Sequence, residues 1–423
     1  MGLKEILPLF PFVLLLLTIA FFPLARHELW EKNSVKAFIS ILFGAPVVIF
    51  LLSEGKLNHL LHVAEEYFSF ISLITSLFIV SGGLFIDIKV PPSPVFNTLI
   101  LLFGSVLSNI IGTTGASMLL IRPFLRINRL RENTFHLPIF FIFTVSNIGG
   151  GLTPIGDPPL FMGFLKGVPF FWSLKLFPIW ILEIGLVLTA FFVWDLITLK
   201  KERKLLEILE ESKRQEGKMS FTIKGKINFF FLLMIIISVI FLRTPLRELV
   251  MWVSASLSWV LTPKDIRERN EFSFEPAKEV AIVFAGIFAT MTPVLDFLRE
   301  NADKFGVDSP WEFFFTTGVL SSFLDNAPTY LTFFAMAQGI TEKFGLTPSV
   351  AGVWEPFLKA ISAGAVFMGA NSYIGNAPNF MVKSISEEMK IKAPNFIFYM
   401  FYSFIILIPS YFLIAFLFFG FPK

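Results

Sequence analysis

The chain contains no cysteine, few histidines and few charged residues. Asp, Glu, Lys and Arg together make up 16% of its 423 residues, whereas soluble domains carry roughly 25%. The absence of cysteine excludes disulfides, thiolate catalysis and cysteine-ligated metal sites. The four histidines fall in predicted loops or on an amphipathic stretch, so no nucleophile and base pair is evident and an enzyme is not expected. A net charge of +3 gives no support for a nucleic-acid partner.

Long apolar runs dominate what is present. Hydrophobic residues make up 55% of the chain and the mean hydropathy is +0.72, which is typical of a protein that crosses the bilayer many times. A membrane-spanning helix needs about 20 apolar residues. Runs of this kind predict helices near residues 6–24, 35–53, 68–86, 137–165, 170–197, 227–242, 246–262, 279–299, 354–383 and 394–420.

Two of these runs are interrupted by Gly, Pro, Asn and Asp. The segments SNIGGGLTPIGDPPLF (146–161) and MGANSYIGNAPNF (368–380) share the core Ile-Gly-[Asp/Asn]-x-Pro. Unwound backbone is tolerated at membrane depth only around a cavity, and paired broken helices indicate the substrate site of a secondary transporter. We therefore expect 137–165 and 354–383 to be broken helices that face each other across a transport site.

Two further apolar stretches, 95–121 and 311–339, have polar kinks at their centres, LSNIIGTTGAS and FLDNAPTYLT. Lys and Arg concentrate in short cytoplasmic loops, and they sort to one side of the membrane only if both stretches are re-entrant hairpins. This sorting also places the N-terminus outside. The predicted fold is an all-α polytopic membrane protein, an inverted repeat with two re-entrant helical hairpins and two broken transmembrane helices.

The two halves align as a duplication. Ile155-Gly156-Asp157 matches Ile374-Gly375-Asn376 at an offset of 219 residues, and Ser108-Asn109 matches Asp325-Asn326 at 217. We predict two repeats carried on scaffold helices and joined by a cytoplasmic linker. The parts are scaffold helices at 1–67, repeat 1 at 68–197, the linker at 198–226, scaffold helices at 227–262 and repeat 2 at 263–423.

Two acids lie inside the duplicated motifs, Asp157 and Asp325, and their repeat partners, Asn376 and Ser108, are neutral. Acids within a membrane core are costly, by roughly 2.5–3.5 kcal/mol, and mark ion or proton paths. Neutral side-chain oxygens accompany them in the same motifs, from Ser108, Asn109, Thr113, Thr114, Asn147, Thr153, Asn326, Thr329, Asn371, Ser372 and Asn376. The residues expected to open the backbone are Gly149, Gly150, Gly156, Pro158, Gly375 and Pro378.

Hard cations such as Na⁺ take oxygen ligands from carboxylates, amides and hydroxyls. The motifs therefore predict a Na⁺ site at Asp157, Asp325, Asn109 and Asn326. A proton and Na⁺ compete for one carboxylate, and competition at an alternating-access site produces exchange of the two ions. Na⁺ and H⁺ are then the transported ions, and no cofactor is expected. Glu183, near the middle of 170–197, is a weaker candidate for a proton relay.

An anion carrier is the rival hypothesis. Half-helix N-termini at the hairpin tips can hold carboxylates with Na⁺ beside them, as in a Na⁺-coupled citrate or dicarboxylate symporter. Against it, such an anion would meet both acids, and the motifs contain no Lys or Arg. Four cations flank the predicted site and could offset the acids, namely Arg122, Lys166, Lys359 and Lys383. A channel is disfavoured because it needs a lined pore rather than duplicated broken helices.

The motifs SNIGGGLTPIGDPPLF and FLDNAPTYLTF resemble those of the ion transporter superfamily, in particular the NhaD-type sodium/proton antiporters and a related branch of citrate transporters. The resemblance covers about residues 68–420. It implies an elevator-like transport unit on a dimeric scaffold, and by likeness alone it also admits arsenite efflux. We expect a homodimer in the inner (plasma) membrane, with small ions and the bilayer as partners. NhaD-type members often carry Asp-Asn where this chain has Ser108-Asn109, so no carboxylate is carried over to that position.

Overall fold

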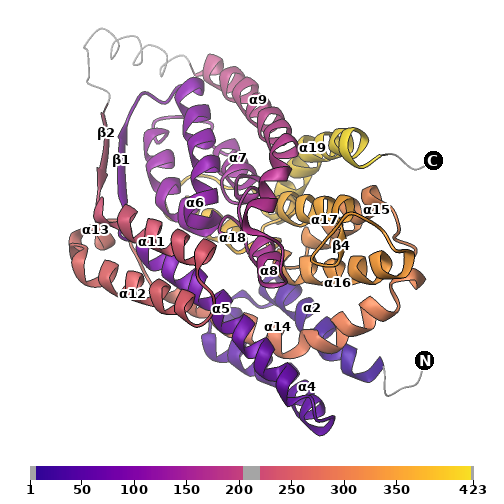
Figure 1. The fold of residues 1–423 in the computed structure, drawn as a ribbon. Coiled ribbons are helices and arrows are strands. Elements are labelled where there is room, and N and C mark those ends of the chain that lie inside the picture. The colour runs from indigo at the N-terminus through magenta and orange to yellow at the C-terminus, as the bar shows by residue number, and fades with distance from the viewer. Residues whose placement is uncertain (1–5, 203–219, 421–423) are drawn as a thin grey trace.

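The structure exposes apolar side chains along several long helices. The computed structural model describes residues 6–202 and 220–420. Within that part, six helices are long and apolar enough to cross a membrane. Large hydrophobic side chains such as Ile41 and Phe230 are exposed, as expected where lipid replaces water. The chain is therefore an all-α polytopic membrane protein (Figure 1). The six helices are Asn33–Ser53, Leu57–Ser81, Pro94–Ile127, Phe170–Lys201, Glu275–Glu300 and Phe396–Phe419.

Helix α6 (Pro94–Ile127) folds back on itself at Gly112. Gly112 has a φ of +79° and a ψ of +155°, a conformation that residues with a Cβ rarely adopt. The amides of Asn97 and Asn128 exchange two hydrogen bonds of 2.9 Å, although a continuous helix would separate them by about 45 Å. The stretch predicted at 95–121 is thus a helical hairpin. Re-entry, with both ends of this hairpin on the same side of the membrane, stays a prediction.

A second hairpin is made of α15 (Pro310–Ser321) and α16 (Asn326–Phe344). The rings of Phe313 and Phe333, on opposite arms, lie 6.4 Å apart. A capping box formed by Ser309 and Glu312 starts the first arm, and the turn that connects the arms precedes Asn326. The hairpin contains the stretch predicted at 311–339.

Both predicted broken helices are interrupted in the structure. The first consists of α7 (His136–Thr144), the 3₁₀ turn η2 (Ile148–Gly150) and α8 (Pro158–Leu165). The second consists of α17 (Glu355–Met368), η5 (Gly369–Asn371) and α18 (Ala377–Glu388).

In each break the chain crosses itself at a point where two glycines approach each other closely. We call these two points the crossings. A Cβ on Gly156 would lie 2.2 Å from the Gly150 carbonyl oxygen, and one on Gly375 would lie 2.5 Å from that of Gly369. Only glycine permits so close a backbone approach at these two equivalent positions.

The order of hairpin, broken helix and long helix recurs in the two halves. The first half ends with α9 (Phe177–Lys201) and the second with α19 (Phe396–Ile414). These two helices pack against each other, as Figure 1 shows in magenta and yellow. The elements of a repeat therefore occur twice in the same order, and the relative orientation of the halves in the membrane stays a prediction.

The helices outside these units pack together. They comprise two groups, one before the first hairpin and one between β2 and the second hairpin. Helix α14 packs on α4 and α5, and α12 packs on α5 and α11 (Figure 1). Their bounds are α2 Phe10–Ala25, α4 Asn33–Ser53, α5 Leu57–Ser81, α11 Ile227–Phe241, α12 Leu246–Leu261, α13 Lys264–Arg269 and α14 Glu275–Glu300.

The structure contains two short antiparallel β-ribbons that were not predicted from the sequence. The helix predicted at 68–86 ends at Ser81, and β1 (Phe85–Lys89) pairs antiparallel with β2 (Ser220–Lys224). The alternating sequences FIDIK and SFTIK suit this pairing, so the helix predicted over 82–86 is wrong there. Residues 203–219 of the predicted linker lie outside the described residues. The second ribbon joins β3 (Ser349–Val350) to β4 (Val353–Trp354).

Candidate functional site

The carboxylate of Asp157 lies where both hairpins and both breaks meet. Its side chain is 1% exposed. Thr113, from the tip of the first hairpin, donates its hydroxyl to Oδ1 at 2.8 Å. Asn326, at the start of α16, donates to Oδ2 at 2.7 Å, and Asn376, from the second break, donates to Oδ1 at 3.1 Å. Four of the predicted site residues are thereby brought into direct contact.

Three helix N-termini converge on this point. Asp157 is the N-cap residue of α8, Asp325 that of α16 and Asn376 that of α18. The positive end of a helix dipole stabilises negative charge within its first turn. Both predicted acids are therefore placed where backbone dipoles partly compensate their charge.

Asp325 has a different environment from Asp157. It is partly exposed, and one of its oxygens accepts a hydrogen bond from the Ala327 backbone N–H at 3.1 Å. This is the usual N-cap interaction. The negative charges of Asp325 and Asp157 repel each other, and Asn326, next to Asp325 in the chain, bonds to Asp157. The two acids thus belong to one electrostatic site.

The equivalent residues Asn326 and Asn109 are used differently. Asn109 donates to the carbonyl oxygens of Ser105 and Gly149 at 3.1 and 2.6 Å, and it accepts from the Leu152 N–H at 2.8 Å. Asn326 donates to Asp157, but its own Oδ1 is buried without a hydrogen bond. A buried oxygen without a donor carries a desolvation cost that a cation can remove. Asn326 Oδ1 is therefore a candidate cation ligand, whereas Asn109 is already satisfied.

Asn371 provides a second buried amide oxygen without a partner. Its Nδ2 donates to Ser322 Oγ at 2.9 Å, at the turn of the second hairpin. The Ser372 hydroxyl donates to the Ser322 carbonyl oxygen. These bonds fix the second break to the second hairpin and leave the Asn371 oxygen available.

Several other predicted site residues make local structural bonds. Ser108 donates to the Val145 carbonyl oxygen at 2.7 Å, and Thr153 donates to that of Asn109 at 2.6 Å. Thr329 donates within α16 to the Asp325 carbonyl oxygen. These hydroxyls hold the hairpins and breaks in place. Their role as ion ligands stays a prediction.

A buried amide that sequence reasoning missed completes the network. Asn379 is fully buried and accepts from Asn147 Nδ2 at 2.7 Å. It donates to the carbonyl oxygens of Gly369 and Ser372 at 2.9 and 2.8 Å. Asn147 in turn accepts from Asn376 at 3.3 Å. Asn379 lies inside the motif MGANSYIGNAPNF, and this position was the available signal.

A cavity of about 50 Å³ lies beside Asp157. It has room for a few water-sized ligands, whereas sites for organic ligands are typically about 300–1,000 Å³. Thr114 and several residues of helix α5 contribute to its wall. The lining residues are Phe70, Leu73, Ile74, Leu77, Phe78, Ile111, Gly112, Thr113, Thr114, Gly115, Pro154, Ile155, Gly156, Asp157, Pro158 and Phe161.

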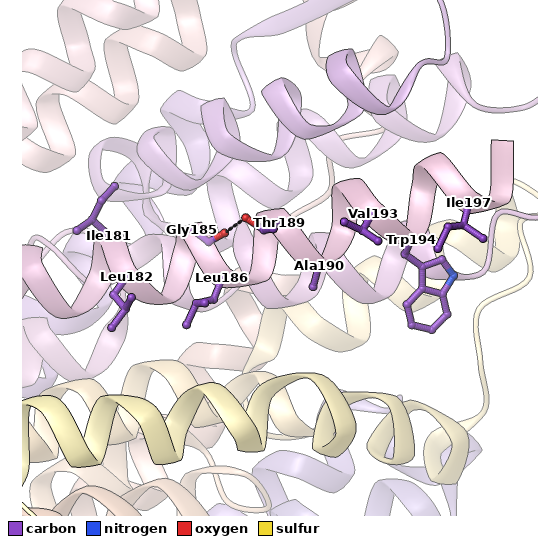
Figure 2. Close-up of a pocket in the computed structure, with 9 residues that line it drawn as sticks. All are labelled: Ile181, Leu182, Gly185, Leu186, Thr189, Ala190, Val193, Trp194 and Ile197. Carbon is purple, nitrogen blue, oxygen red and sulfur yellow. Dashed lines mark hydrogen bonds between the residues drawn. The ribbon is translucent and has the colours of Figure 1, made fainter. Parts of the chain in front are cut away.

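A larger hollow of about 720 Å³ runs along α9 (Figure 2). Its lining has no ionisable side chain, and the one hydroxyl, of Thr189, donates to the Gly185 carbonyl oxygen within the helix. An apolar groove on a helix of this kind suits lipid acyl chains rather than ion chemistry. The lining residues are Ile181, Leu182, Gly185, Leu186, Thr189, Ala190, Val193, Trp194 and Ile197.

The four cations that flank the predicted site are paired with other acids. Arg122 lies 2.5 Å from a Glu271 oxygen. The other three pairs are Lys166 with Glu66 at 2.7 Å, Lys359 with Glu355 at 3.6 Å and Lys383 with Glu387 at 2.9 Å. Within the described residues, no Lys or Arg forms an ion pair with Asp157 or Asp325.

The prediction for His136 is wrong. It was expected in a loop or on an amphipathic stretch, but its side chain is fully buried at the start of α7. Its Nε2 lies 2.8 Å from Asp195 Oδ1, and Arg131 also pairs with Asp195. Asn97, at the base of the first hairpin, donates to the same carboxylate at 2.9 Å. The cluster ties the hairpin to α7 and α9, which explains the burial.

Duplicated hairpins and broken helices that gather acids and amides deep in a membrane protein define the class of secondary transporters. The chain matches the family described as "Putative citrate transport" over residues 3–419, and it belongs to that family. No curated protein is similar enough to count as a match.

Proposed function

We propose that this transporter exchanges Na⁺ for H⁺ at Asp157 by alternating access. The observation that carries the proposal is the set of groups around this carboxylate. Its hydrogen-bond partners are neutral, and the nearest of them, Asn326, also holds an amide oxygen buried without a donor. A carboxylate next to an unsatisfied neutral oxygen suits a small hard cation.

Competition between the two ions follows from this arrangement. A buried acid is stable either with a proton or with a cation beside it, because an unpaired charge is costly in a low-dielectric site. Na⁺ binding requires the charged form of Asp157, and protonation removes that charge. Alternating access then moves one ion inward and the other outward. Asp325, at the neighbouring helix N-terminus, adds a second negative charge that favours cations.

The amides supply the adjustable part of the site. In the structure, Asn326 and Asn376 turn their NH₂ groups toward Asp157. Rotation of either amide would present an oxygen instead, so the same side chains can satisfy the carboxylate without an ion and share a cation with it.

A Na⁺-coupled citrate or dicarboxylate symporter is the second candidate. The family description and the converging helix N-termini favour it. However, the flanking cations are paired elsewhere, and the cavity beside Asp157 is about 50 Å³. An organic anion would need both a different conformation and a compensating charge. We therefore place the symporter second.

Reconstitution separates the two candidates. Purified protein in liposomes, with a pH-sensitive dye inside, receives an inward Na⁺ gradient, and a parallel sample receives labelled citrate or succinate. The proposal predicts proton efflux that depends on Na⁺ and needs no organic anion. Uptake of the labelled anion without Na⁺-driven proton movement would establish the symporter instead.

The proposed function also includes an oligomeric state and a membrane location. We propose that the protein acts as a homodimer in the inner (plasma) membrane, with the helices of residues 1–67 and 227–262, which include α2, α4, α11 and α12, as the scaffold. Cross-linking of the purified protein in lipid nanodiscs measures the subunit number, and a monomer that transports at full rate would contradict the dimer.

A further inference from the structure

Helix α9 carries a buried acid that takes no part in the Asp157 site. Glu183 is fully buried within an apolar span. The Ser410 hydroxyl, on α19, donates to its Oε1 at 2.8 Å, whereas its Oε2 is buried without a hydrogen bond. Within the described ranges, no Lys, Arg or His pairs with it.

Asp195 on the same helix provides an internal comparison. It is also fully buried, but Arg131, His136 and Asn97 all contact its carboxylate. Its negative charge is therefore compensated. Glu183 has one hydroxyl donor and, among the described residues, no positive charge beside it, and a charged carboxylate in such a place is less stable than the neutral acid. Burial without a compensating positive charge therefore favours the neutral, protonated form of Glu183.

Glu183 lies at the contact between α9 and α19, and each of these helices donates a hydrogen bond to or beside one of the two breaks. Trp180, one turn earlier on α9, donates its indole N–H to the Gly149 carbonyl oxygen in the first break at 3.2 Å. Tyr411, next to Ser410 on α19, donates its hydroxyl to the Phe367 carbonyl oxygen before the second break at 2.8 Å. Figure 2 shows α19 running alongside α9. The acid therefore belongs to the same packed unit as the ion site.

We propose that Glu183 is a second proton-binding site, which carries one proton per cycle in addition to the exchange of H⁺ for Na⁺ at Asp157. This inference rests on the proposed function. Because Oε2 is buried in the described state, the proton is taken up and released only in other states of the cycle, in which water reaches that oxygen first from one side of the membrane and then from the other. The proton on Asp157 is replaced by Na⁺ of equal charge. The proton on Glu183 is not, so it adds one positive charge to the net movement per cycle.

The test is the ratio of protons to Na⁺ in proteoliposomes under a clamped membrane potential. The Na⁺ gradient that a fixed pH gradient sustains is measured for the wild type and for Glu183→Gln. We expect the variant to lose one proton from the ratio. At zero potential, the Na⁺ gradient sustained by one pH unit then falls by about tenfold. The charge moved per cycle also falls by one, so the sustained Na⁺ gradient depends less on the membrane potential in the variant.

Two controls accompany this variant. Glu342→Gln makes the same chemical change at a side chain that is 69% exposed, and we expect the wild-type ratio. Glu183→Asp keeps the acid, and we expect the wild-type ratio at a lower rate. An inactive Gln variant beside an active Asp variant also supports the proposal, because it shows that an ionisable group is required.

Three results would overturn it. One is a folded Glu183→Gln variant with the wild-type ratio, which would mean that the acid stays protonated throughout. Another is misfolding of that variant, because Gln has the shape of the neutral acid. The third is inactivity of both the Gln and Asp variants. The proposed function fails separately, if the wild type moves no protons against Na⁺.

Discussion

Asp157 and Asn376 occupy equivalent positions in the two motifs and are hydrogen-bonded to each other. The Asn376 amide donates to Asp157 Oδ1 at 3.1 Å across 219 residues of sequence, and 219 is also the offset that aligns the motifs. Equivalent residues of a duplicated fold meet only near the axis that relates the halves. The charge of Asp157 is therefore placed at that axis, and the second half supplies a neutral partner.

Removal of this charge should abolish exchange without loss of the fold. Asp157→Asn keeps the size and hydrogen-bonding capacity of the side chain, and a neutral group lowers the desolvation cost. We expect Na⁺-driven proton movement to fall by at least about 100-fold, or about 2.7 kcal/mol, while the protein stays monodisperse in detergent.

The contact with Asn376 allows the charge to be moved across the axis. Asn376→Asp in the Asp157→Asn background should restore part of the activity, measured in the same liposome assay. Full exchange in Asp157→Asn alone would show that this carboxylate is structural.

The two equivalent asparagines of the hairpins should respond differently to substitution. Asn326→Ala removes the unpaired amide oxygen next to Asp157, and we expect the apparent KM for Na⁺ to rise about tenfold, equivalent to about 1.4 kcal/mol. Asn109→Ala breaks bonds to Gly149 and Leu152, and we expect a loss of about 1–3 kcal/mol in the free energy of unfolding. Equal effects of the two variants on Na⁺ affinity would argue against this difference.

The buried cluster at Asp195 should contribute to stability rather than to ion binding. Asp195→Asn removes the nearer of the two carboxylates that pair with the buried Arg131, the other being Glu202 at 3.5 Å, and breaking a buried pair costs about 3 kcal/mol. The measurement is unfolding of the purified protein in detergent. Asp265→Asn is the control, because Asp265 is 56% exposed and pairs with Arg269 at 3.7 Å, so that less than about 1 kcal/mol is expected. A neutral outcome for Asp195→Asn would contradict a structural role.

The inverted orientation of the halves can be measured directly because the chain has no cysteine. Single cysteines at Asn133 and Lys343 should react with a membrane-impermeant thiol reagent from opposite faces, Asn133 from the cytoplasm and Lys343 from outside. Labelling of both positions in intact cells from one side would rule out the inverted repeat.

The sequence predicted the hairpins and breaks well because glycine, proline and polar residues inside apolar runs have few structural explanations. Gly112 marks the tip of the first hairpin, and Gly156 and Gly375 mark the two crossings. Composition could not predict which polar atoms have hydrogen-bond partners. Asn109 and Asn326 have equivalent positions in the motifs, and only the folded structure shows that one oxygen is bonded and the other is free.

Long-range pairing was the other gap. His136 and Asp195 are 59 residues apart, and no local pattern links them. The ribbon between β1 and β2 likewise depends on two short segments far apart in the chain. Such contacts arise from tertiary packing, which overrides the local periodicity from which helices are predicted.

The most direct test of the central claim is the apparent KM for Na⁺ as a function of pH, measured in proteoliposomes for the wild type and Asp157→Asn. Protons that compete with Na⁺ for Asp157 should raise the wild-type KM as the pH falls, by up to about tenfold per pH unit. As the pH rises, the KM should decrease and then level off once the carboxylate is fully charged. A wild-type KM that does not change with pH across the active range would contradict exchange at this residue.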